Sequence, residues 1–124
     1  MFDKILVGTD GSKTAAKAVD RAVKVAATSG ATLTIFSAAP KAKGEEIVGA
    51  AAKAHASGSV EIDTMVVDTD PVSGLIEAAD KGGYDLLVMG NKGMTGVTRF
   101  FRLGSVPNKV THHLPCSLLI VKTT

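Results

Sequence analysis

Short apolar runs alternate with amphipathic segments along this chain of 124 residues, and this alternation restricts the possible folds more than any other feature. Apolar runs of roughly four to eight residues between turn residues are typical of buried strands, whereas apolar residues at helical spacing predict helices. Strands that alternate with helices predict an α/β fold, with helices on both faces of a parallel sheet. The expected strands are residues 4–9, 31–38, 60–67, 84–89 and 116–121, and the expected helices are residues 12–28, 44–57, 70–81 and 105–113.

Capping residues and glycines predict where these helices begin and end. Asp70 followed by Pro71 predicts a helix start, because an acidic cap accepts free N–H groups and proline suits the first turn. Gly30 and the pair 82–83 are expected to end helices. The polar stretch 40–44 is expected to connect the second strand to a short helix that starts near Gly44 and is closed by Gly58.

Length and composition indicate one globular domain that binds neither nucleic acid nor a membrane. The chain is long enough for one core, and with 4% aromatic residues and no Trp that core must consist mainly of aliphatic side chains. A net charge of +2 from scattered basic residues is too small to indicate a nucleic-acid surface. The single cysteine, Cys116, excludes an internal disulfide, and neither a signal core nor a spanning apolar stretch is found. A cytoplasmic protein is expected.

Two glycine-containing segments point to phosphate chemistry. The first, residues 90–93 (Gly-Asn-Lys-Gly), follows the fourth expected strand, and the second, Gly104–Ser105, precedes the last expected helix. Glycines let backbone N–H groups approach an anion, and a helix start adds unpaired N–H groups and a positive dipole end. Taken alone, the first segment could be a plain turn, but the two together favour a phosphate-binding site.

The turn after the first expected strand offers a carboxylate. Residues 8–14 are not a phosphate loop, because only two residues separate Gly8 from Gly11, where that loop needs four between its first glycine and its Gly-Lys pair. Ser12 is expected to cap the helix that follows, while Asp10 is expected to hydrogen-bond a ligand. The alternative is that Asp10 itself is only a cap.

These segments together resemble the universal stress protein family. Its nucleotide-binding members carry two glycines two residues apart, then nine residues, then glycine followed by Ser or Thr. Gly90, Gly93 and the step Gly104–Ser105 match this order, although ten residues, 94–103, stand in the middle. The opening residues 4–12 and the closing residues 104–110 and 115–121 resemble the family as well. Family members commonly have a longer segment after the second strand, so this chain resembles a compact version.

The resemblance implies a doubly wound, five-stranded parallel sheet with strand order 3-2-1-4-5. That order places the ends of the first and fourth strands at the topological switch point, where ligands bind. The implied site has a nucleoside end and a phosphate end. It comprises Gly8, Thr9, Asp10 and Ala38 for the nucleoside, and Gly90, Asn91, Lys92, Gly93, Gly104, Ser105 and Val106 for the phosphates.

The function implied is binding of ATP or another adenine nucleotide by a stress-response sensor or regulatory module that forms a homodimer through the last strand. Mg²⁺ is a candidate companion of the triphosphate. Two alternatives stay open: a homodimeric interaction module without nucleotide, and a weak ATPase. No nucleophile–base pair supports an enzyme, and His55, His112 and His113 do not form a metal-ligand set.

Overall fold

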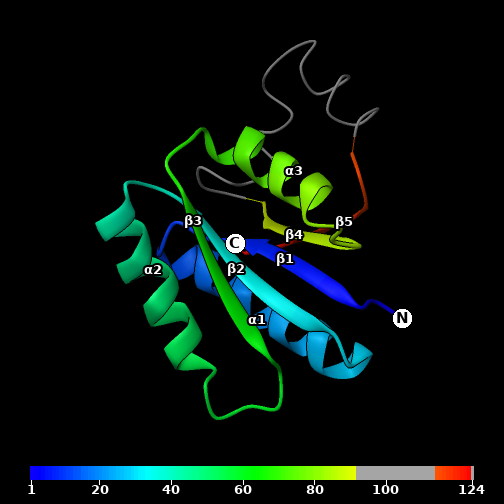
Figure 1. Cartoon of the computed structure of the whole chain (residues 1–124). Helices are drawn as coiled ribbons and strands as arrows, with labels where there is room; N and C mark the ends of the chain where they lie inside the picture. Colours follow the sequence, from blue (N-terminus) through cyan, green and yellow to red (C-terminus); the bar gives the residue numbers. More distant parts are fainter. Residues whose placement is uncertain (92–113, 124) are drawn as a thin grey trace.

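The expected parallel sheet is present in the structure, a computed structural model in which residues 1–91 and 114–123 are described. Its strands follow the order β3-β2-β1-β4-β5, as expected, and all four pairings are parallel (Figure 1). The strands are β1 (Lys4–Gly8), β2 (Thr32–Ala38), β3 (Ile62–Val67), β4 (Leu86–Gly90) and β5 (Ser117–Val121). The helix expected at 105–113 lies outside the described residues.

Helices cover both faces of the sheet, as the alternation predicts. Figure 1 shows α1 (Lys13–Ser29) and α2 (Lys41–Ala54) on one face and α3 (Pro71–Lys81) on the other. The two faces carry separate clusters of buried residues, because successive side chains of a strand point to opposite faces. In the central strand β1, Ile5 and Val7 pack toward α1, whereas Leu6 packs toward α3.

The helix boundaries at α1 and α3 confirm the capping predictions. The Ser12 side chain accepts a hydrogen bond from the N–H of Ala15 at 3.1 Å, and Gly30 ends α1 with φ of 70°. The Asp70 side chain accepts the N–H of Ser73 at 3.1 Å, and Pro71 is the first residue of α3.

The prediction for the second helix was wrong at its start. Residues 41–44 are not a connection, because α2 begins at Lys41 with Pro40 as its N-cap. Gly44 is a buried interior residue whose missing side chain lets α2 approach β3, and a Cβ there would stand 2.2 Å from Cγ1 of Val66. The helix ends at Ala54 rather than near Gly58. Glycine at position 44 therefore reflects close packing rather than a helix boundary.

The structure begins β4 at Leu86, two residues later than predicted, and the residues before it anchor the sheet through their side chains. Tyr84 is buried and its hydroxyl donates to Oγ1 of Thr34 at 2.8 Å. The Asp85 carboxylate accepts the N–H groups of Asp3 and Lys4 at 2.8 and 3.0 Å. These contacts lie at the amino ends of β1 and β4, away from the carboxyl ends where a ligand is expected.

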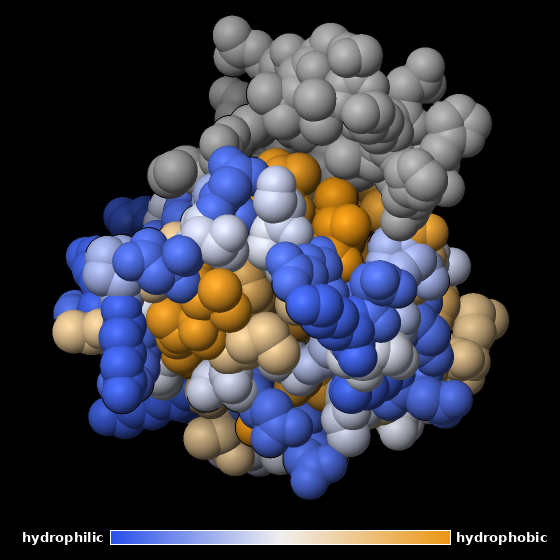
Figure 2. Space-filling view, turned by 45° about the horizontal axis from the view of Figure 1, so that its top comes forward, coloured by the Kyte–Doolittle hydropathy of each residue, from blue (hydrophilic) through white to orange (hydrophobic). Residues whose placement is uncertain are grey.

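The surface shown in Figure 2 is mainly hydrophilic, with hydrophobic residues in a few separate groups. Among the large hydrophobic residues that the structure describes, Met1 and Val67 are the exposed ones. Within residues 1–91 and 114–123, no helix has both the length and the apolar character required to span a bilayer.

Candidate functional site

A tight turn carries the chain from β1 into α1, and internal hydrogen bonds fix its shape. The N–H of Thr9 donates to the carbonyl of Phe36 in β2 at 2.9 Å, and the buried Thr9 hydroxyl accepts the N–H of Gly11 at 3.1 Å. Gly11 has φ of 83°, a conformation that favours glycine. Position 10 is therefore held rigidly above the end of the central strand.

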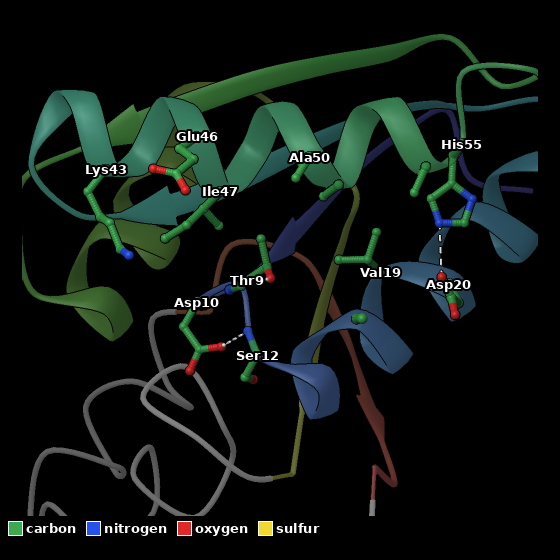
Figure 3. A pocket seen from close by; sticks show the side chains of 14 residues that line it. Thr9, Asp10, Ser12, Val19, Asp20, Lys43, Glu46, Ile47, Ala50 and His55 are labelled. Atoms are coloured by element: carbon green, nitrogen blue, oxygen red, sulfur yellow. Dashed lines mark hydrogen bonds and ion pairs between the residues drawn. The ribbon is translucent and has the colours of Figure 1, made fainter.

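Asp10 is half-exposed on this turn, and one of its carboxylate oxygens is engaged. Oδ1 accepts the N–H of Ser12 at 2.9 Å, while Ser12 uses its own hydroxyl to cap α1 (Figure 3). Among residues 1–91 and 114–123, no donor hydrogen-bonds Oδ2 of Asp10. The prediction that Ser12 caps the helix is confirmed. Ligand binding by Asp10 stays a prediction.

The nucleoside end of the predicted site lies where β1 and β2 end side by side. Ala38 is the last residue of β2 and is half-buried, and Ala39 continues the ladder by donating its N–H to the carbonyl of Val67 at 3.1 Å. Gly8 is the last residue of β1. A Cβ at this position would stand 2.7 Å from Cδ1 of Leu75 in α3. Gly8 therefore allows α3 to pack on β1, a role that needs no ligand.

The phosphate end is described as far as Asn91. Gly90 is the buried last residue of β4, paired with Val121 of β5, and it is not among the described glycines with positive φ. An unusual backbone conformation is therefore not what requires glycine at this position. Lys92, Gly93, Gly104, Ser105 and Val106 lie outside the described residues.

Asn91 takes part in strand pairing, which sequence reasoning did not anticipate. Its N–H donates to the carbonyl of Val121 at 3.0 Å, so this donor belongs to the β4–β5 ladder. Its side-chain oxygen Oδ1 accepts both the N–H and the hydroxyl of Thr123 at 2.9 Å. The expectation for residues 90–93 was a run of backbone donors facing phosphate, and the donor of Asn91 is engaged elsewhere.

A cavity of about 390 Å³ lies between α1 and α2, next to the β1 turn (Figure 3). Of the predicted site residues, Thr9 and Asp10 line it, whereas Ala38 and Gly90 do not. The cavity therefore adjoins the predicted crevice rather than coinciding with it. The rest of its lining consists of Gly11, Ser12, Ala16, Val19, Asp20, Lys43, Glu46, Ile47, Ala50, Ala51, Ala54 and His55.

Charged groups stand at both ends of this cavity. Lys43 and Glu46, on the first turns of α2, lie at the end nearest Asp10 (Figure 3). At the far end, Nε2 of His55 lies 2.9 Å from Oδ1 of Asp20, which links the end of α2 to α1. Neither residue was predicted from the sequence: Lys43 lies in the stretch 40–44 that was expected to be a connection, and Glu46 lies in the expected helix without a motif to mark it. The polar composition that suggested a connection equally suits the exposed face of a helix.

The described residues offer little for covalent or metal chemistry. Burial raises the pKa of the Cys116 thiol, and the nearby Asp85 charge acts in the same direction, so this half-buried cysteine is a weak nucleophile. No three His, Cys, Asp or Glu side chains among residues 1–91 and 114–123 are grouped to hold a metal ion. The arrangement suits noncovalent binding.

Comparison with known proteins identifies the relatives of this chain. The model of the universal stress protein family matches residues 1–47 and 37–122. The chain belongs to the universal stress protein family. It is 29% identical over 144 residues to a universal stress protein of Mycobacterium tuberculosis, an alignment that covers 99% of this chain and 98% of the relative. A universal stress protein of Bacillus subtilis is 29% identical over 149 residues, which cover 98% of this chain and 100% of the relative.

Solved universal stress proteins share the fold. A universal stress protein crystallised in complex with cAMP superimposes with a TM-score of 0.80 and 40% identity, covering 99% of this chain and 98% of that one.

The two matching segments of the family model overlap at residues 37–47, where β2 passes into α2. Both alignments to curated relatives span more positions than this chain has residues, so the relatives carry residues that it lacks. This chain is therefore shorter than these two relatives.

Proposed function

We propose that this protein binds adenine nucleotides in the crevice at the carboxyl ends of β1 and β4. The observation that carries the proposal is the meeting of two features at neighbouring strand ends. The pairing of β1 with β4 runs to Val7 and Val88, so the Asp10 turn and Gly90 leave the sheet side by side. This is the switch point of a doubly wound sheet, and the related structure at 40% identity was crystallised with cAMP.

The nucleoside end would be held by Asp10 and the end of β2. Since Oδ1 of Asp10 is occupied by Ser12, its other oxygen can accept a hydrogen bond from one ribose hydroxyl. One hydroxyl is what cAMP retains, because its 3′ oxygen is esterified, whereas AMP and ATP retain two. The backbone of Ala38 would face the adenine. This geometry suits the whole group of adenine nucleotides, with ATP as the proposed physiological ligand.

The phosphates would be held by the glycine segments 90–93 and 104–106, as the sequence motif predicts, apart from the N–H of Asn91, which donates to Val121. A triphosphate brings several negative charges, and Mg²⁺ usually binds through phosphate oxygens, water and one or two carboxylates. The described residues provide Asp10 near the crevice but no cluster of ligands. We therefore propose that any Mg²⁺ is bound mainly by the nucleotide rather than by the protein.

The proposed role is that of a sensor or regulatory module, with nucleotide occupancy as its signal. Homodimerisation is proposed through the edge strand β5, whose Leu118, Leu119 and Ile120 are half-buried in the single chain. A second copy would cover the open edge of this strand and bury these side chains further. The cytoplasm is the proposed location, consistent with a single free cysteine.

Bound nucleotide and titration together test the proposal. Acid extraction of the purified protein followed by mass detection would identify a copurifying ligand, and calorimetry would compare cAMP, AMP and ATP, with GTP as the base control. Asp10→Ala should weaken AMP and ATP by a similar factor of about ten to a hundred, because a hydrogen bond to a charged group contributes roughly 1.5–3 kcal/mol. Asp63→Ala, on the exposed face of β3, is the matched control and should leave affinity unchanged.

The alternatives predict different results. A selective loss of ATP affinity in Asp10→Ala, with AMP unaffected, would place this carboxylate at a metal ion rather than at the ribose. A dimer that binds none of the four nucleotides would favour the interaction module. Turnover of ATP that disappears in a Gly90 variant would favour the weak ATPase.

A further inference from the structure

The C-terminal tail is tied to the end of β4 by a compact set of hydrogen bonds. Thr123 is only 2% exposed although it lies beyond the end of β5. Its N–H and hydroxyl both donate to Oδ1 of Asn91 at 2.9 Å, and its carbonyl accepts a hydrogen bond from Nζ of Lys17 in α1 at 3.0 Å. The tail is thus held from two sides, by β4 and by α1.

The side chain of Asn91 takes the place of a backbone group in the parallel ladder. In such a ladder, a residue that donates its N–H to one residue of the partner strand accepts, with its own carbonyl, the N–H two residues further along. The N–H of Asn91 donates to Val121, so its carbonyl would normally accept the N–H of Thr123. Instead, Oδ1 accepts this N–H. The backbone of Asn91 can therefore turn out of the sheet while the N–H of Thr123 keeps a hydrogen-bond acceptor.

This exchange fixes the point at which the chain turns out of β4. Gly90 is the last residue of the strand, and Asn91 already lies in a bend. A residue without a side-chain acceptor at position 91 would leave the N–H and the buried hydroxyl of Thr123 without this partner, or would draw the backbone carbonyl of residue 91 back into the ladder. Either change moves the backbone at the phosphate end of the proposed site.

We propose that Asn91 and Thr123 form a positioning pair for the nucleotide site, with Lys17 fixing the tail from α1. The pair holds the end of β4 and so fixes the position of Gly90 at the phosphate end of the proposed site. This inference rests on the proposed adenine-nucleotide function. It assigns the C-terminal tail a role in phosphate binding without contact between Thr123 and the ligand.

Asn91→Ala and Thr123→Val test the pair, with Thr123→Ser as the matched control that keeps the hydroxyl. Affinities for adenosine, AMP and ATP are measured by calorimetry, and stability is measured separately by thermal unfolding. We expect Asn91→Ala to lose about tenfold in AMP and ATP affinity, with adenosine affinity nearly unchanged. Thr123→Val should lose a smaller factor in the same pattern, and Thr123→Ser should bind like the wild type.

Hydrogen exchange provides a readout that needs no ligand. Amide exchange of peptides that contain residues 88–91 and 119–123 should accelerate in Asn91→Ala but not in Thr123→Ser. A variant that is merely less stable would bind all three ligands in the wild-type ratio, and this result would overturn the positioning role. If the wild type bound no adenine nucleotide, the proposed function and the positioning role would both fall, even where the exchange result held.

Discussion

Replacing Gly44 by alanine should destabilise the protein relative to the same replacement at Gly49, although both residues belong to α2. In a helix interior, alanine is favoured over glycine by about 1 kcal/mol, and this gain is common to both variants. A Cβ at Gly49 meets no atom within 4 Å. A Cβ at Gly44 would stand 2.2 Å from Cγ1 of Val66 and 3.2 Å from its Cβ.

The neighbour of Gly44 cannot easily move aside. Val66 is β-branched and sits in β3, so its methyl groups are fixed by a stiff χ1 angle and by the sheet. Relief requires α2 to shift away from β3, and overpacking of this kind typically costs about 1–3 kcal/mol. Because the helix-propensity gain cancels in the comparison, the difference between the two variants measures the overpacking directly.

Urea and thermal unfolding of the two variants beside the wild type provide the assay. We expect Gly49→Ala to be more stable than the wild type by about 0.5–1 kcal/mol, and Gly44→Ala to be less stable than Gly49→Ala by about 1–3 kcal/mol. In a domain of this size, each kcal/mol corresponds to about 4 °C in Tm. Equal stabilisation by both substitutions would refute the close packing of α2 on β3 at Gly44.

Further predictions concern the crevice, the edge strand and the amino ends of the strands. Gly90→Val should abolish most nucleotide affinity in a calorimetric titration, because the valine methyl groups would fill the space where phosphate is proposed to approach. Unchanged affinity in a folded variant would show that this turn does not bind phosphate. Leu119→Lys should weaken the proposed dimer in sedimentation, since it places a charge on the edge strand, and a wild type that is already monomeric at micromolar concentration would contradict the dimer. Burial alone raises the pKa of the Asp85 carboxyl, but the N–H groups of Asp3 and Lys4 outweigh this, so its pKa lies below the ordinary value. Its stabilising effect is present above the unfolded-state pKa of about 4 and is lost as the pH falls through the lower folded-state pKa. Asp85→Asn should therefore lose less stability than the wild type as the pH falls below about 4.

The sheet could be predicted from the sequence because its three central strands, β2, β1 and β4, are largely buried on both faces. Ile5, Leu6 and Val7 are fully buried, and such unbroken apolar runs need no tertiary information to be recognised. The helix starts at Ser12 and Asp70 could also be predicted from the sequence, because each capping side chain accepts a backbone N–H only three residues away. The strand order, in contrast, came from the family resemblance, because alternation alone does not determine which strands are neighbours.

The start of α2 could not be predicted, because its signals belong to tertiary packing. Glycine at position 44 normally disfavours a helix, and only the approach of β3 explains why the helix tolerates it there. The same limit applies to Asn91. Asparagine after a strand suggests a turn residue, and its contact with Thr123, 32 positions away in the sequence, is visible only in three dimensions.

The start of α2 at Lys41 has a consequence for the proposed site. Because α2 begins at Lys41, directly after β2 and Pro40, its first turns stand beside the Asp10 turn, and Ile47 packs against Gly11, where a Cβ would lie 3.2 Å from Cγ1 of Ile47. The side of the crevice next to the proposed nucleoside end is thus bounded by a helix that packs closely on β3 at Gly44. The packing of Gly44 on Val66 and the placement of Asp10 are therefore linked through one rigid helix, although neither residue contacts the other.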